Sequence, residues 1–139
     1  MPADSEIALV HAVLDEFHAA ASAAEEKAYF ALLAPGAVFL GTDPGERWAG
    51  DDYRAFVHGY FSQGKGWTYE PSSRSVTIAE DGQTAWFDER LENEWYSECR
   101  GTGVLQLREG EWKIEQYNLT IPIPNELVAE VVARIRELR

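Results

Sequence analysis

The stretch Arg100–Asn118, RGTGVLQLREGEWKIEQYN, decides the fold class, because it predicts two antiparallel strands joined by a tight turn. Residues 100–108 and 112–121 alternate side chains with the period of two that is typical of strands. Glu109-Gly110 lies between them and fits a hairpin connection. The chain therefore contains an antiparallel sheet in its C-terminal half.

Three further stretches before this hairpin have strand character. Residues 67–70 and 74–79 read as strands interrupted at Pro71, and residues 84–93 follow after the strong turn signal Asp81-Gly82. An earlier strand is predicted over residues 37–42, with a loop over residues 43–50. The meander from residue 67 onward predicts that consecutive strands pair with one another.

Helical periodicity dominates the N-terminal part and returns at the C-terminus. A first helix is expected from Asp4 or Ser5, a second from Ser22 to about Leu33, a third from Asp51 or Asp52 to Phe61, and a last one after Pro124. Helices followed by an antiparallel meander indicate an α+β fold, in which a curved antiparallel sheet wraps over the N-terminal helices. We expect residues 1–139 to form a single domain.

Composition and charge exclude several function classes. The 139 residues carry a formal net charge of −12, whereas binding to nucleic acid or to an anionic membrane needs a basic surface. No apolar run approaches the roughly 18 residues of a membrane helix, and MPADSEIALV does not resemble a secretion signal. We therefore expect a cytoplasmic protein that binds neither nucleic acid nor membranes.

The chain has no recognisable metal or cofactor motif. Gly101-Thr102-Gly103 begins like a dinucleotide fingerprint but lies in a predicted strand, and no Cys/His spacing resembles a zinc site. Cys99 is the only cysteine, so no internal disulfide can form. His11, His18 and His58 are interpreted as ordinary surface or half-buried histidines. The sequence predicts no metal and no cofactor.

Polar residues on predicted inward strand faces suggest a lined cavity. In the last strand, Gln116 and Asn118 share a face with Trp112 and Ile114 if the alternation runs unbroken. In residues 84–93, Glu89 shares a face with apolar side chains and is expected to point inward. The opposite assignment would instead place Asp88 inside.

An inward Glu89 has two interpretations. It is either part of a satisfied internal network, for example paired with Arg100, or a desolvated general acid or base with a raised pKa. The network interpretation is favoured, because the amides Gln116 and Asn118 supply no titrating partner on the adjoining strand. Arg100, Gln116 and Asn118 are predicted on the pocket wall with Glu89, which is the candidate catalytic residue.

The mouth of the pocket is predicted from the loop over residues 43–50 and the start of the meander. Asp43, Glu46, Trp48 and Trp67 are expected there, although Asp43 before Pro44 also fits a plain turn. In the alternation of residues 84–93, Trp86 lies on the face opposite that of Glu89. It is therefore predicted to point outward, over the glycines of a neighbouring strand. An exposed aromatic residue on a sheet predicts a homodimer interface.

Several blocks of the sequence resemble the SnoaL-like proteins of the nuclear transport factor 2-like superfamily. The blocks are Phe39-Leu40-Gly41-Thr42-Asp43, Glu46-Arg47-Trp48, 85–89, 100–105 and, most clearly, Trp112–Leu119. That superfamily includes ketosteroid isomerases, scytalone dehydratase and polyketide cyclases. The resemblance implies a cone, a pocket at its open end and frequent dimerisation through the outer sheet face.

The resemblance implies proton-transfer chemistry without cofactors for some members and ligand binding alone for others. Many SnoaL-like chains have histidines where this one has Gln116 and Asn118, so that site is not carried over. We expect binding of a small, partly apolar molecule in the pocket. The alternatives are a cofactor-free isomerase, dehydratase, cyclase or hydrolase, and a homodimerisation module.

Overall fold

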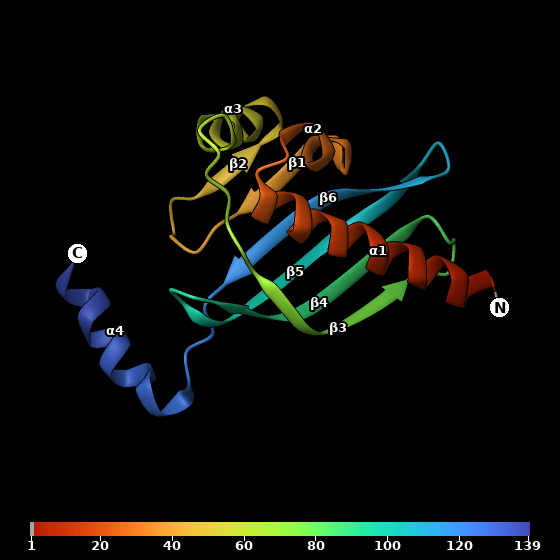
Figure 1. The fold of residues 1–139 in the computed structure, drawn as a ribbon. Helices are drawn as coiled ribbons and strands as arrows, with labels where there is room; N and C mark the ends of the chain where they lie inside the picture. The colour runs from red at the N-terminus through yellow and green to blue at the C-terminus, as the bar shows by residue number, and fades with distance from the viewer. Residues whose placement is uncertain (1) are drawn as a thin grey trace.

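A six-stranded sheet forms the centre of the computed structural model, which describes residues 2–139. The strands are β1 (Leu33–Leu40), β2 (Arg47–Ala49), β3 (Glu70–Ile78), β4 (Thr84–Asn93), β5 (Ser97–Arg108) and β6 (Glu111–Thr120). They lie in the order β2-β1-β6-β5-β4-β3, and the sheet is curved but not closed (Figure 1). The predicted α+β architecture is confirmed.

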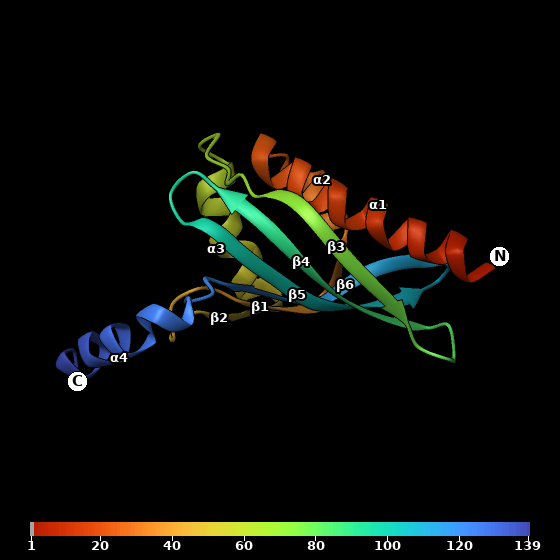
Figure 2. The same cartoon turned by 90° about the horizontal axis from the view of Figure 1, so that it is seen from below.

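The helices are α1 (Pro2–Ala23), α2 (Glu26–Ala31), α3 (Gly50–Phe61) and α4 (Val128–Glu137), the last preceded by the short 3-10 helix η1 (Asn125–Leu127). Helix α1 lies along one face of the sheet, while α4 projects away from the rest of the molecule (Figures 1 and 2). None of the helices between residues 2 and 139 has the length and apolar content required to cross a bilayer.

The apolar stripe of α1 explains how the helix packs on the sheet. Val10, Leu14, Phe17 and Ala21 recur every three or four residues, and all four are buried. In α3, Tyr53, Val57 and Phe61 follow the same rule. These stripes meet the inward residues of the sheet in one core, which the periodicity of the sequence predicts.

The sheet differs from the predicted one at its N-terminal strand. Strand β1 begins at Leu33, includes the Pro35-Gly36 pair expected to follow a helix, and pairs with β6 in parallel. Strand β2 lies within the predicted loop over residues 43–50 and pairs antiparallel with β1. The sheet is therefore mixed and not purely antiparallel. The predicted sheet differs because local sequence patterns do not show how a strand pairs with one far along the chain.

Strand β6 contains an irregularity that decides which side chains face the interior. Val104 pairs with Gln116, but Leu105 pairs with Ile114, so Glu115 has no partner on β5. An extra residue of this kind is a β-bulge, and it reverses the alternation beyond it. Tyr117 is consequently buried and Gln116 is exposed.

Candidate functional site

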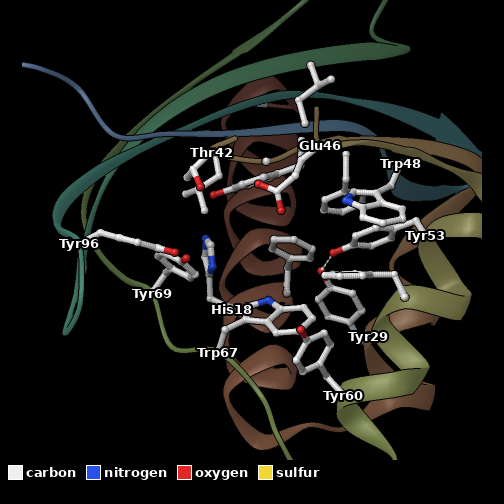
Figure 3. Close-up of a pocket in the computed structure, with 17 residues that line it drawn as sticks. His18, Tyr29, Thr42, Glu46, Trp48, Tyr53, Tyr60, Trp67, Tyr69 and Tyr96 are labelled. Atoms are coloured by element: carbon white, nitrogen blue, oxygen red, sulfur yellow. Dashed lines mark hydrogen bonds between the residues drawn. The ribbon is translucent and has the colours of Figure 1, made fainter. Parts of the chain in front are cut away.

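A cavity of about 270 Å³ lies between the inner face of the sheet and the first three helices. Most of the 17 residues that line it are aromatic, and the set comes from α1, α2, α3, β1, β2, β6, the loop between β1 and β2, and the segments after α3 and β4 (Figure 3). The polar side chains on its wall include His18 and Glu46. Such a mostly apolar cavity with a few polar groups is typical of a small-molecule site.

Glu89 lies at the centre of a buried polar cluster behind the cavity wall. Its side chain is 1% exposed, which confirms the inward orientation predicted for it. Oε1 accepts a hydrogen bond from Arg74 Nε at 2.8 Å, and Oε2 accepts one from the Tyr117 hydroxyl at 2.6 Å. The same Oε2 lies 2.7 Å from His18 Nε2. Three side chains from three different elements therefore hold this carboxylate.

The sheet register brings these side chains together. Arg74 on β3 lies directly opposite Glu89 on β4, and Gly101 on β5 lies on the other side of Glu89. A Cβ on Gly101 would overlap the Tyr117 hydroxyl and lie 2.8 Å from Glu89 Oε2. The absence of a side chain at Gly101 therefore lets Tyr117 reach across β5 from β6 to Glu89.

The cluster keeps Glu89 ionised. Burial raises the pKa of this carboxyl group, but the hydrogen bonds from His18, Tyr117 and Arg74, with the charge that His18 carries when it is protonated, outweigh burial and lower the pKa below its ordinary value. Burial and the neighbouring Glu89 raise the pKa of the Tyr117 hydroxyl, which stays protonated and donates. The favoured prediction of a paired carboxylate is thus supported, with Arg74 as the cation in place of Arg100.

Glu89 also fixes the tautomer of His18. An ionised carboxylate has no proton to donate, so the short contact requires that Nε2 of His18 carries the proton. In the neutral ring Nδ1 is then the proton acceptor. Among the described residues, Nδ1 has no hydrogen-bond partner, and His18 lines the cavity. The arrangement presents a basic nitrogen on the cavity wall, oriented by a buried carboxylate.

Three of the predicted pocket residues line the cavity, namely Glu46, Trp48 and Trp67. Asp43 does not. Asp43 is exposed, and its carboxylate accepts a hydrogen bond from the Gly45 N–H two residues further along the loop. The interpretation of Asp43 as a turn residue is therefore the one that fits.

Arg100, Gln116 and Asn118 do not line the cavity, and their predicted placement on its wall is wrong. Arg100 is exposed and belongs to the outward-facing set of β5. Gln116 is exposed and Asn118 half-buried, since the bulge at Glu115 turns both amides away from the face that holds Ile114.

Sequence reasoning missed His18, Arg74 and Tyr117. His18 was expected to be ordinary, yet it follows Leu14 by four residues and so shares the buried face of α1. Arg74 could have been found from the Asp81-Gly82 turn, whose hairpin register places it opposite Glu89. Unbroken alternation along residues 112–121 places Tyr117 on the face opposite Ile114, and the bulge at Glu115, which the alternation does not predict, brings it to the same face.

Other polar groups reach the cluster through Arg74, whose Nη1 lies 3.0 Å from Asp15 Oδ1 and 3.2 Å from His11 Nδ1. Cys99 is fully buried, and burial raises the pKa of its thiol, with Glu92 and Glu98 adding to the effect. Between residues 2 and 139, no three His, Cys, Asp or Glu side chains converge in a way that could hold a metal ion. The polar chemistry at the cavity is therefore that of His18, Glu46 and the tyrosines.

Solved structures similar to this one share its fold. A provisionally named dehydratase of the NTF2-like family from Streptomyces avermitilis superposes with a TM-score of 0.73 at 11% identity, over 88% of this chain and 99% of that one. A provisionally named scytalone dehydratase from Novosphingobium aromaticivorans gives 0.70 at 12% identity, over 86% and 85%. A protein of unknown function with a cystatin-like fold from Nostoc punctiforme gives 0.67 at 11%, over 82% and 89%.

Sequence comparison supports the same relationship. No curated protein has a sequence significantly similar to this chain. The model of the SnoaL-like domain, however, matches residues 10–124, which include α1 from Val10 onward, the whole sheet and every residue of the Glu89 cluster. The chain therefore belongs to the SnoaL-like family, within the NTF2-like fold.

Proposed function

We propose that this protein is a cofactor-free acid–base enzyme that acts on a small, partly apolar molecule bound in the cavity. The observation that carries the proposal is the pair formed by His18 and Glu89. Glu89 accepts the Nε2 proton, and Nδ1 of His18 stays unpaired on a wall that is otherwise largely aromatic. A base oriented in this way can remove a proton from a bound ligand and return it elsewhere, which is the chemistry of isomerases and dehydratases.

Within this proposal Glu89 is a positioning residue rather than the base. Its lowered pKa and its three hydrogen bonds make it a poor proton acceptor, whereas a carboxylate bonded to an imidazole stabilises the imidazolium that forms when the ring takes up a proton. This assignment replaces Glu89 by His18 as the candidate catalytic residue. The relatives named as dehydratases support a reaction of this class.

Solvent deuterium exchange tests the proposal directly. β-Tetralone is an apolar bicyclic ketone whose C–H bonds beside the carbonyl are acidic, and NMR in deuterated buffer follows their exchange. We expect the wild-type protein to accelerate the exchange above the buffer rate. The substitution His18→Gln should reduce the protein-dependent part of the exchange rate, above the buffer rate, by about 100-fold or more, as removal of a general base does.

His58→Gln is the matched control, because His58 is an exposed histidine that does not line the cavity and whose Nδ1 contacts Glu26. It should leave the exchange rate unchanged. Equal rates for wild type and His18→Gln would contradict the role of His18, and a wild-type rate no faster than buffer would contradict catalysis. Retained binding of the ketone would then favour the second candidate, a ligand-binding protein without chemistry.

We also propose that the chain forms a homodimer, for which α4 is the supporting observation. Val128 and Ile135 of α4, and Leu127 of η1 just before it, are each more than 40% exposed, and neither helix has a buried residue. Residues 125–139 contain as many basic as acidic side chains, so the rest of the chain carries the whole net charge of −12. A helix with an apolar face and a neutral charge balance can pack on a second, acidic copy with little repulsion.

Light scattering tests the homodimer. Wild type should have the mass of a dimer, and Ile135→Glu should have that of a monomer, because the new carboxylate would be buried in the interface. Ala133→Glu adds the same charge on the opposite side of α4 and should remain dimeric. A monomeric wild type would contradict the proposal.

A further inference from the structure

The cavity wall formed by α3 and its neighbours is largely aromatic. Trp48 stacks on Phe56 with ring centroids 4.5 Å apart. Tyr60 and Trp67 lie 6.2 Å apart with an interplanar angle of 78°, and Phe56 contacts both of them. Trp48 and Phe56 are thus nearly parallel, whereas Tyr60 and Trp67 meet at a steep angle, so the wall presents electron-rich ring faces in more than one direction, and such faces attract a cation.

Glu46 adds a carboxylate to this aromatic wall. Figure 3 shows its side chain pointing towards the middle of the lining residues, with Trp48 beside it and Trp67 and Tyr60 further across the cavity. Glu46 Oε1 accepts the backbone N–H of Asp43 at 2.8 Å and lies against Gly41, where a Cβ would come within 2.9 Å of it. The loop therefore holds this carboxylate in place.

In the described part of the chain, no cation neutralises Glu46. It forms no ion pair with any Lys, Arg or His within residues 2–139. None of the residues described as lining the cavity is Lys or Arg. An anionic ligand would find a carboxylate and aromatic faces there without a compensating positive charge. A cationic ligand would find both a counter-ion and faces to contact.

We infer that the cavity selects ligands that carry an alkylated ammonium group on a small apolar body. The ammonium group lies beside Glu46 and Trp48, where cation–π attraction and the carboxylate act together, with Phe56, Tyr60 and Trp67 on the rest of the wall. The inference rests on the proposed small-molecule function and specifies the class of its substrate. His18 lies on a different side of the cavity, so an apolar body anchored by its ammonium group extends towards the base (Figure 3).

Calorimetric titration with three probes of similar shape tests the inference. Phenyltrimethylammonium is the cation, tert-butylbenzene is its neutral isostere, and benzenesulfonate is an anion with the same ring. We expect the cation to bind about tenfold more tightly than the neutral probe, and the anion not to bind detectably. Equal affinity for cation and isostere, or a preference for the isostere, would overturn the inference.

The substitution Glu46→Gln isolates the carboxylate, because the amide oxygen can still accept the Asp43 N–H. It should reduce the affinity for phenyltrimethylammonium about tenfold and leave that for tert-butylbenzene unchanged. Glu92→Gln is the matched control, since it changes the net charge equally on an exposed residue outside the cavity. If Glu92→Gln lowers the affinity for phenyltrimethylammonium as much as Glu46→Gln does, net charge explains the preference and the inference is wrong.

These outcomes separate the inference from the proposed function. Binding of tert-butylbenzene without a preference for the cation removes the inference and leaves the pocket and its His18 chemistry standing. Absence of binding by all three probes removes both the ammonium class and the use of this cavity for small aromatic molecules. Deuterium exchange that depends on His18, measured separately, bears on the proposed function alone.

Discussion

Glu46 lines the cavity and Glu89 lies behind its wall, and their surroundings give these two glutamates opposite properties. Glu89 is 1% exposed, accepts hydrogen bonds from Arg74 and Tyr117, and contacts His18. Glu46 is half-buried and accepts one backbone hydrogen bond. A buried carboxylate must be paired with a cation because it has lost its water, whereas a carboxylate at a cavity mouth remains free for a ligand.

The comparison teaches that residue type alone does not identify a catalytic carboxylate. The pairing of Glu89 lowers its pKa and makes it a fixed acceptor that orients His18. The position of Glu46 gives it no such partner and leaves its charge directed at the cavity. Substitutions at the two sites should therefore separate stability from ligand recognition.

The largest expected effect is that of Glu89→Gln. The amide NH₂ would face donors on Arg74, His18 or Tyr117, and the buried guanidinium of Arg74 would keep only the exposed carboxylate of Asp15, at 3.0 Å, as an ionic partner. We expect the free energy of unfolding to fall by about 3–5 kcal/mol. Urea unfolding at neutral pH, followed by circular dichroism, measures the change.

Glu98→Gln is the control for that loss, because it removes a carboxylate from an exposed ion pair with Arg90 at 2.7 Å. Exposed pairs contribute at most about 1 kcal/mol. If Glu89→Gln and Glu98→Gln lower the free energy of unfolding by the same amount, the buried cluster stabilises the fold no more than a surface ion pair does.

Acid should remove the contribution of Glu89 in a defined range. Because its pKa is lowered in the folded state, its stabilisation is complete above the ordinary glutamate pKa of about 4.3 and is lost as the pH falls through the folded value. The difference in unfolding free energy between wild type and Glu89→Gln should therefore narrow steadily below that pH. Parallel pH profiles of the two proteins would contradict the lowered pKa.

Gly101→Ala should destabilise the cluster without removing any polar group. The new Cβ would overlap the Tyr117 hydroxyl and crowd Glu89, so the Tyr117 side chain must move and weaken its hydrogen bond. Overpacking of this kind costs about 1–3 kcal/mol, which thermal or urea unfolding will detect.

Gly59→Ala provides the contrast, because Gly59 lies in α3 with open space around its missing Cβ. Alanine is the better helix former by about 1 kcal/mol, so this substitution should stabilise the protein. Destabilisation of similar size at both positions would show that the close approach at Gly101 is not the cause.

Most of the fold could be predicted from the sequence, since it follows from local periodicity. The stripes of α1 and α3 and the Asp81-Gly82 turn lie where their patterns indicate. At the Glu109-Gly110 connection both residues have positive φ, of 51° and 81°, as a two-residue hairpin turn of this type requires. The parallel pairing of β1 with β6 joins segments far apart in the chain, and no local pattern specifies it.

The candidate site was only partly predictable, because it depends on one bulge and one helix face. The inward position of Glu89 follows from alternation, but the bulge at Glu115 shifts the buried set from Ile114 to Tyr117. The change of apolar phase along β6, from even to odd positions, is the signal that could have shown it. His18 is polar on a largely apolar helix face, and only the three-dimensional proximity to Glu89 distinguishes it from an ordinary half-buried histidine.

The smallest expected effect, and the one that sharpens the comparison most, is that of Glu46→Gln on stability. The amide oxygen can accept the Asp43 N–H as the carboxylate does, and the loop keeps its other bond, from the Gly41 N–H to the Glu46 carbonyl at 2.9 Å. No buried cation loses a partner, so the free energy of unfolding should change by less than about 0.5 kcal/mol. Glu46→Ala, which removes the acceptor, should cost about 0.5–1.5 kcal/mol because the freed N–H is left to water. Urea unfolding of both variants beside Glu89→Gln provides the measurement. A loss at Glu46→Gln as large as that at Glu89→Gln would mean that Glu46 is a structural carboxylate like Glu89, and that the contrast between the two glutamates is wrong.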